Sequence, residues 1–247
     1  MSQLPEALVT IFQRGFVIDS AGKERPLDSN ISESEAGELF DAVLRLAPNN
    51  SLEVGLAHGI SALAILGAIK VNGSGHHHII DPFQSNYGRT GVLNIERNGY
   101  GLISSFYEKF PEEIIPSLPN IQFAFVDSSH LFDLTLMEFA LIDKKLEVGG
   151  IIAFHDLWMP AIRTVVRYIL GNRAYEIATE LTSRSAAVSF REKTKELCGQ
   201  ILSYLPGGER IFRRDILKPW SSYRLGNLIF LRKISDDRRD WRFHRSF

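Results

Sequence analysis

Short apolar runs alternate with longer amphipathic segments through most of the chain. The runs have the length and composition of buried strands, and they lie at 51–54, 78–81, 102–107, 122–126, 150–154 and 227–233. Segments with apolar residues at helical spacing separate them, at 61–71, 90–98, 111–115, 131–145 and 161–170. Such alternation predicts a parallel sheet with helices on both faces. We therefore expect a doubly wound, Rossmann-like α/β fold with a mostly parallel, seven-stranded sheet.

The two ends of the chain depart from this alternation. We divide a single domain into an N-terminal extension, a core, an insertion and a last strand with its tail, at 1–30, 31–170, 171–226 and 227–247. The core opens with a helix that Ser32 caps, with Glu35 as its capping-box partner. The insertion before the last strand is either a cover over a substrate or a surface excursion without a role.

A loop with two glycines joins the first strand of the core to its helix. Glu53 stands near the end of the strand, Gly55 and Gly59 lie in the loop, and the helical pattern begins at about Ser61. Neither glycine carries a side chain that would keep a ligand away from the backbone at the start of the helix. The glycines are four residues apart, which argues against the dinucleotide fingerprint G-x-G-x-x-G and hence against a dehydrogenase.

An acidic residue ends the next strand along the chain. Asp81 follows the apolar run that begins at about Gly75, one strand–helix unit after the glycine loop. A carboxylate in this position accepts hydrogen bonds from the two ribose hydroxyls of a nucleoside. The glycine loop and Asp81 together predict a ligand that contains a nucleoside.

Acids and imidazoles also follow two later strands. Asp127 and His130 come after the strand at 122–126, and His155 and Asp156 come after the strand at 150–154. Strands separated by one helix are expected to be neighbours, so these four side chains should meet at one edge of the sheet. Buried charges are rarely left unpaired, and we therefore predict a cation site or a proton-transfer site.

The acid before the first glycine is similar to motif I of class I methyltransferases that depend on S-adenosylmethionine (SAM). The stretch from about 26 to about 175 resembles bacterial class I O-methyltransferases of the group that includes the macrolide-sugar O-methyltransferases. It also resembles the catechol and caffeoyl-coenzyme A O-methyltransferases. In those families one strand ends in Asp with a basic residue three positions later, and the next ends in two metal-ligating residues.

The resemblance implies a cofactor and a reaction. SAM would lie along the glycine loop and the next two strand ends, on Glu53, Gly55, His58, Gly59, Ser61, Asp81 and Glu108. Asp127 and Asp156 would be metal ligands, and His130 would be the general base that takes the proton of an acceptor hydroxyl.

His155 departs from the family pattern, because the relatives carry an acidic residue in its place. Magnesium prefers oxygen ligands, whereas imidazole suits softer ions. His155 is therefore a ligand of manganese, iron or zinc, or a neighbour of the ligands of magnesium, or a sign that no metal binds. We expect a divalent cation, with magnesium first and manganese or another ion as the alternative.

The acceptor is less well defined by the sequence. Tyr87, Arg89, Trp158 and Met159 follow strand ends and either line the acceptor site or pack against the core. We predict O-methylation of a small-molecule hydroxyl of the sugar, phenol or polyketide type. The alternative is a SAM-binding regulatory or assembly protein without transferase activity, which would not need the acids and imidazoles together.

Composition limits the partners of this protein. The chain has 247 residues, a formal net charge of -1 and a single cysteine, so it offers no electrostatic case for nucleic acid or membrane binding and no disulfide framework. The first residues lack a basic stretch followed by an apolar one, so we expect no signal peptide and a cytoplasmic location. We expect a small-molecule acceptor as partner and leave open whether the protein is a homo-oligomer.

Overall fold

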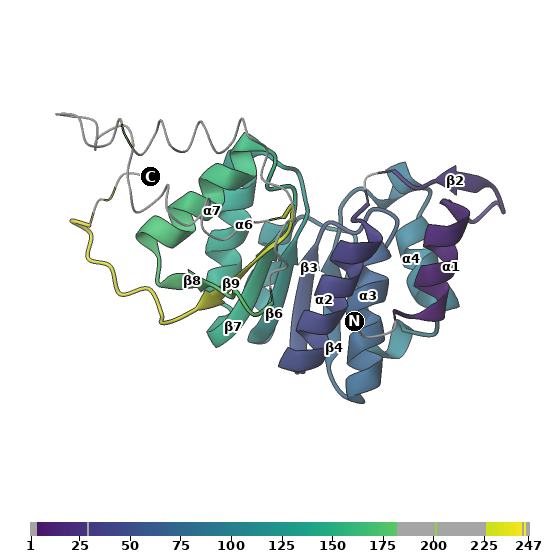
Figure 1. Cartoon of the computed structure of the whole chain (residues 1–247), viewed down its shortest axis with the longest axis horizontal. Coiled ribbons are helices and arrows are strands. Elements are labelled where there is room, and N and C mark those ends of the chain that lie inside the picture. The colour runs from purple at the N-terminus through teal and green to yellow at the C-terminus, as the bar shows by residue number, and fades with distance from the viewer. Residues whose placement is uncertain (1–3, 29, 182–200, 202–225, 244, 246–247) are drawn as a thin grey trace.

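A computed structural model describes residues 4–28, 30–181, 201, 226–243 and 245. Its centre is a seven-stranded sheet with the strand order β5-β4-β3-β6-β7-β9-β8 (Figure 1). The strands are β3 (Asn50–Val54), β4 (His76–Ile80), β5 (Ser104–Tyr107), β6 (Ile121–Val126), β7 (Leu146–Phe154), β8 (Tyr175–Ile177) and β9 (Ile229–Lys233). Neighbouring strands from β5 to β7 are parallel, and β9 is antiparallel to both β7 and β8. The predicted Rossmann-like α/β fold with a mostly parallel sheet is confirmed.

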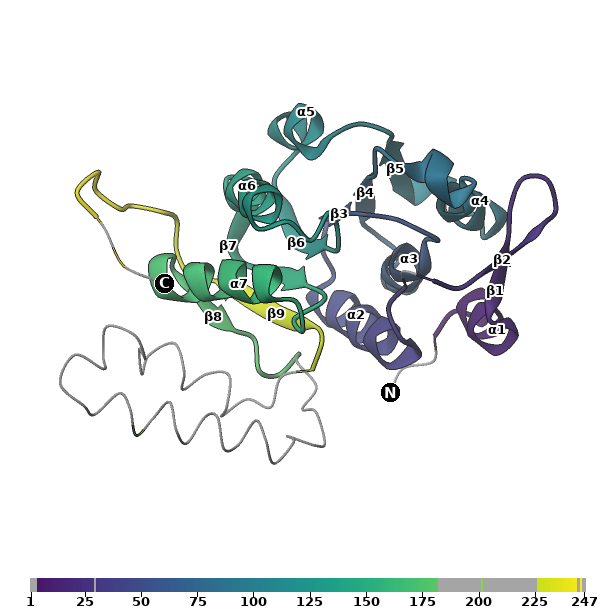
Figure 2. The same ribbon diagram turned by 90° about the horizontal axis from the view of Figure 1, so that it is seen from above.

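Helices cover both faces of the sheet. They are α2 (Glu33–Leu46), α3 (Ile60–Asn72), α4 (Thr90–Arg97), α5 (Pro111–Ile114), α6 (Phe132–Asp143) and α7 (Pro160–Asn172), with short 3-10 turns η1 (Gln84–Tyr87), η2 (Gly101–Ile103) and η3 (Ile115–Ser117). Seen from above, α2 and α3 lie on one side of the sheet and α5 and α6 on the other (Figure 2). Successive residues of β6 point to opposite faces of the sheet, and each face has its own hydrophobic core. Phe123 and Phe125 pack in the core that contains α2 and α3, and Ala124 and Val126 pack in the core on the opposite face.

The N-terminal extension forms three short elements and packs on the core. It consists of α1 (Glu6–Arg14) and a hairpin of β1 (Phe16–Ile18) and β2 (Glu24–Pro26). Leu8 is fully buried in the core cluster that contains α2 and α3. A side chain at Gly67 of α3 would place its Cβ 2.3 Å from the ring of Pro5, so this glycine lets the extension approach the helix closely.

The structure differs from the predicted elements mainly where strands are short or irregular. Strand β8 falls at the start of the predicted insertion, and its three residues are too few to produce an alternating pattern. Strand β7 begins at Leu146 rather than at 150, and its pairing with β6 shifts register between Ile121 and Phe123. The segment 171–181 therefore continues the core, and most of the predicted cover lies outside the described residues. Among the described residues no helix has the length and apolar character to cross a membrane.

Candidate functional site

A cavity of about 530 Å³ lies at the edge of the sheet where the parallel strands end. Its wall joins the glycine loop to the ends of β6 and β7 and to the segment before α2. The wall contains Leu27, Asp28, Asn30, Ile31, Gly55, Leu56, Ala57, His58, Ile60, Ser61, Tyr87, Asp127, Ser128, His130, His155, Asp156 and Met159. Seven of the sequence-predicted site residues thus meet in one cavity: Gly55, His58, Ser61, Asp127, His130, His155 and Asp156.

Backbone hydrogen bonds align the strand ends that form this cavity. The N–H of Asp81 donates to the carbonyl of Tyr107, and the N–H of Gly55 donates to the carbonyl of Ile80. On the other side of β3, the N–H of Asp127 donates to the carbonyl of Val54 at 3.0 Å. The N–H of His155 at the end of β7 donates in the same way to the carbonyl of Val126 at the end of β6. The ends of β3, β4, β5, β6 and β7 therefore lie at one edge of the sheet, where the four predicted side chains after β6 and β7 also lie.

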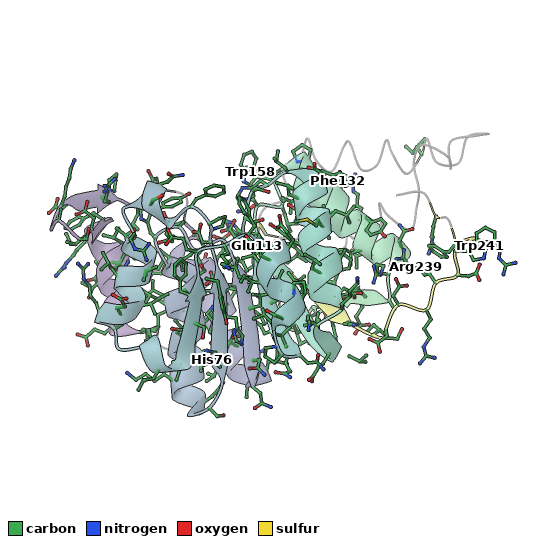
Figure 3. The ribbon with its side chains drawn as sticks, turned by 180° about the vertical axis from the view of Figure 1, so that it is seen from behind. His76, Glu113, Phe132, Trp158, Arg239 and Trp241 are labelled. Atoms are coloured by element: carbon green, nitrogen blue, oxygen red, sulfur yellow. The ribbon has the colours of Figure 1, made fainter. Side chains whose placement is uncertain are left out.

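His130 bridges the two carboxylates of the site. Its Nε2 lies 3.1 Å from Oδ1 of Asp127 and 2.9 Å from Oδ2 of Asp156. Among the described residues, these three form a group whose ligand atoms lie within 4.8 Å of one another, as a metal ion requires. Trp158 Nε1 donates a hydrogen bond of 2.8 Å to Oδ1 of Asp156, and the indole itself is exposed at the top of the sheet (Figure 3).

His155 lies beside this group and connects it to helix α2. It is only 6% exposed, and its Nε2 lies 3.3 Å from Oε1 of Glu35. Its Nδ1 faces the carboxylates at 3.4 Å from Asp127 and 3.5 Å from Asp156, and has no partner with hydrogen-bond geometry. In its charged form this nitrogen carries a proton toward the two carboxylates, and in its neutral form it offers a lone pair to a bound cation in the same place.

Two residues of the site carried no functional signal in the sequence. Glu35 forms the predicted capping box with Ser32, but its other carboxylate oxygen reaches His155 because α2 begins at the same edge of the sheet. Asn227, just before β9, places its amide nitrogen 3.0 Å from His155 and donates to Asp156. Only the pairing of β9 with β7 brings Asn227 to the site, so the sequence offered no means of finding it.

The carboxylates and imidazoles of the cluster stabilise one another's charged forms. Hydrogen bonds from the imidazole of His130 to the carboxylates of Asp127 and Asp156 outweigh burial and raise the pKa of His130 to about 9. Burial opposes the charged form of His155, but Asp127 and Glu35 outweigh it and raise its pKa to about 10. Burial likewise disfavours the charged form of Asp127, yet His130 and His155 keep the pKa of this carboxyl below its ordinary value. The pKa of Asp156 is lowered, chiefly by His130. Near neutral pH the cluster therefore consists of carboxylates and imidazolium ions.

Two residues of the cluster adopt a backbone conformation that side chains disfavour. His130 and Asp156 both have φ of 57°, in the left-handed region. Such a conformation costs on the order of 1–3 kcal/mol per residue and concentrates at functional sites. Because the two side chains also contact each other, the strained turns after β6 and β7 aim both groups into one place.

The glycine loop has a different physical basis from the one that its sequence suggested. A Cβ on Gly55, whose φ is +94°, would lie 1.9 Å from the carbonyl oxygen of Asp127. A Cβ on Gly59, with φ +79°, would lie 3.0 Å from the backbone of Gly91 at the start of α4. Both glycines are thus required by contacts within the protein. Gly55 also lines the cavity, whereas Gly59 does not belong to its wall.

Two predicted cofactor ligands lie behind the loop. Glu53 is fully buried and does not line the cavity. Its carboxyl group is hydrogen-bonded to the hydroxyl of Ser61 and to Nε2 of His77. Burial raises the pKa of Glu53 well above its ordinary value. The carboxylate of Asp81 accepts hydrogen bonds from the N–H groups of Leu56 and Ala57, each at 3.1 Å, and is 5% exposed. Both acids shape the loop, and their contact with a cofactor stays a prediction.

The remaining predicted residues divide between the cavity and its surroundings. His58 is in the wall, where Nδ1 lies 2.7 Å from Thr90 Oγ1 and Nε2 lies 2.9 Å from Asp28 of the N-terminal extension. Glu108 pairs with Arg89 at 2.5 Å outside the wall. Of the acceptor candidates, Tyr87 and Met159 line the cavity, whereas Trp158 and Arg89 do not.

Comparisons with known proteins agree with this fold. Residues 52–157 match the family model of a methyltransferase domain. Among solved structures, the chain is similar to the O-methyltransferase TomG of Streptomyces achromogenes, involved in tomaymycin synthesis and solved with SAM. The two are 14% identical, with a TM-score of 0.57 over 72% of this chain and 83% of that one. No curated protein sequence matches the chain.

Two further structures share the fold. The O-methyltransferase of Bacillus cereus, solved with S-adenosylhomocysteine (SAH), is 14% identical with a TM-score of 0.59, over 72% of this chain and 84% of that one. The SAH-bound methyltransferase PaMTH1 of Podospora anserina is 14% identical with a TM-score of 0.57, over 94% of this chain and 89% of that one. At this identity the likeness establishes the fold. Together with the family match over residues 52–157 it supports the resemblance to class I O-methyltransferases.

The raised pKa of His155 predicts how stability depends on pH. An unfolded imidazole has a pKa of about 6.5. A group whose pKa is higher in the folded state stabilises the fold below its unfolded pKa and loses that contribution as the pH rises through the folded value. We therefore expect the free energy of unfolding to fall between pH 7 and pH 10, and to fall less in His155→Gln, as measured by denaturant titration without metal.

His76→Gln is the matched control for this experiment. Burial lowers the pKa of His76, so this imidazole is neutral above pH 7 in both the folded and unfolded states. Its replacement should leave the alkaline slope unchanged. Parallel curves for the wild type and His155→Gln would show that His155 is not held in its charged form.

Proposed function

We propose that this protein is a SAM-dependent methyltransferase that transfers a methyl group to the hydroxyl of a small molecule with the help of a divalent cation. One observation carries the proposal: a single cavity joins the glycine loop at the start of α3 to the cluster of Asp127, His130 and Asp156. Its volume of about 530 Å³ falls within the range of small-molecule sites, roughly 300–1,000 Å³.

The glycine-loop side of the cavity suits the cofactor. Helix α3 begins at Ile60, so its first N–H groups and the positive end of its dipole favour the carboxylate of the methionine part of SAM. Ser61 and His58 supply polar side chains on the same wall. The structural neighbours TomG, the Bacillus enzyme and PaMTH1 hold SAM or SAH, which supports the same ligand for this fold.

The opposite side of the cavity suits the acceptor. His130 is the base in this proposal, because its imidazole is the titratable group between the two carboxylates and lines the cavity. Asp127 and Asp156 orient the imidazole, and Tyr87 and Met159 complete the wall. Fixing an acceptor oxygen in line with the transferable methyl supplies much of the rate enhancement for such a reaction.

The residues of the cluster fit a divalent cation. Two carboxylates and one or two imidazoles form a mixed oxygen and nitrogen donor set, which suits manganese, iron or zinc and also allows magnesium. Asp127 and Asp156 would hold the ion, with the unpartnered Nδ1 of His155 as a third donor. A bound cation would lower the pKa of an acceptor hydroxyl and, by neutralising the carboxylates, that of His130.

A SAM-binding protein without transferase activity is the competing function. It would need the glycine loop and Asp81, but it would have no use for two carboxylates and two imidazoles at the far side of the cavity. The strained backbone of His130 and Asp156 favours an enzyme over a binding protein, because backbone strain concentrates where it positions reacting groups.

Cofactor binding provides the first test. Calorimetric titration with SAH should show binding to the wild type and clear weakening in Asp81→Ala, because this substitution removes the ribose acceptor and also the carboxylate that holds Leu56 and Ala57. Asp19→Ala is the control, since Asp19 is an equally buried carboxylate that supports the extension instead. Unchanged SAH affinity in Asp81→Ala would contradict both roles of this residue.

Metal binding can be measured without knowledge of the acceptor. We expect the wild type to bind Mn²⁺, seen as loss of the free-ion signal in electron paramagnetic resonance, and Asp127→Asn to lose this binding. His155→Gln decides the role of His155: weakened Mn²⁺ binding identifies a ligand, and unchanged binding identifies a neighbour of the ligands. Failure of the wild type to bind Mn²⁺, Mg²⁺ or Zn²⁺ would remove the metal from the proposal and leave the acids as orienting groups for His130.

The base can be tested once an acceptor has been found by screening. His130→Gln should lower kcat by roughly 10²-fold or more while SAH affinity stays near that of the wild type, because a base acts in the transition state. The wild type should lose activity as the pH falls and His130 becomes protonated, and the variant should lack this acidic limb. Equal kcat per folded molecule in the two proteins would show that His130 only packs.

A further inference from the structure

A second cavity, of about 540 Å³, lies between the N-terminal extension and helices α3 and α4. Its wall shares no residue with the first cavity. Figure 1 shows α1 and α4 together at one end of the molecule, away from α7. The proposed methyl transfer makes no use of this cavity.

Three cations from three different helices line the second cavity. They are Arg14 of α1, Lys70 of α3 and Arg97 of α4, and the only carboxylate in the wall is that of Glu6. Within the described part of the chain, no carboxylate lies within ion-pair distance of any of the three cations. Among the residues that the structure describes, the wall therefore carries three positive charges against the single negative charge of Glu6.

Two of these cations are held in place. Arg97 donates from Nη1 to the carbonyl of Ile18 at 2.6 Å and from Nη2 to that of Asp19 at 3.3 Å. The ammonium of Lys70 lies over the ring of Tyr100, 5.5 Å from its centroid. Side chains that are fixed before binding lose less entropy when a ligand arrives, so these contacts favour an anion at this place.

The rest of the wall is largely apolar. It includes Pro5, Ile11, Phe16, Val17 and Ile18. The three cations are exposed, and an apolar wall beside a few charged groups is typical of a small-molecule site. We propose that the second cavity binds an organic anion, with a carboxylate or phosphate head on the three cations and a short apolar body against α1 and β1.

The test uses hexyl phosphate, hexanoate, hexanol and inorganic phosphate as probes, with thermal shift and calorimetry at physiological salt. A ligand that binds only the folded state raises the melting temperature by mass action. At least one of the two organic anions should bind, and hexanol and inorganic phosphate should bind more weakly than that anion. The better of hexyl phosphate and hexanoate then identifies the head group.

Variants separate the site from nonspecific attraction. The double variant Arg14→Gln with Lys70→Gln should weaken the anion by roughly tenfold or more, and Lys144→Gln, an exposed lysine outside the wall, should not. Arg97 is left intact because it ties β1 to α4. An unchanged melting temperature without ligand shows that the double variant folds.

Three outcomes would overturn the proposal. Absence of binding by both organic anions would show that the cavity is not a site. Equal affinity in the double variant would show that the cations do not form it. Hexanol or inorganic phosphate binding as tightly as the organic anions would show that the charged head or the apolar body plays no part.

Discussion

The carbonyl oxygen of Asp127 lies where the side chain of residue 55 would begin. This close approach of the end of β3 to the end of β6 is open only to glycine, since a Cβ would lie 1.9 Å from that oxygen and φ is +94°. The contact brings the loop that starts α3 beside the turn that carries Asp127 and His130. The cavity between the two parts exists because of it, and so does the proximity of the proposed cofactor and acceptor sites.

The charges of the cluster depend on this arrangement in turn. Asp127 and Asp156 come from adjacent parallel strands, and two half-buried carboxylates with oxygens within 4.8 Å of each other would repel without cations between them. His130 and His155 supply that positive charge in the folded protein, with Glu35 as a further partner of His155. A divalent cation would replace part of the imidazolium charge, so proton release and metal binding are expected to be coupled.

Most of the fold could be predicted from the sequence, because regular strands and helices leave a periodic pattern. The parallel core from β3 to β7 was predicted this way, and so were Asp127, His130, His155 and Asp156 as one group. Strand β8 has only three residues and left no such pattern. Asn227 and Glu35 reach the site through tertiary packing, which no local signal records. The glycines were identified as important but for a different reason, since their missing side chains face the protein's own backbone.

The N-terminal extension shows how far function depends on contacts that sequence patterns do not reveal. Its segment after β2 provides Leu27, Asp28 and Asn30 to the first cavity, and Asp28 contacts the otherwise buried His58. Its helix α1 and strand β1 form one side of the second cavity. The close packing of Pro5 against Gly67 holds the start of α1 against α3. The extension is therefore a structural part of both cavities, and the methyltransferase-like core does not form either of them alone.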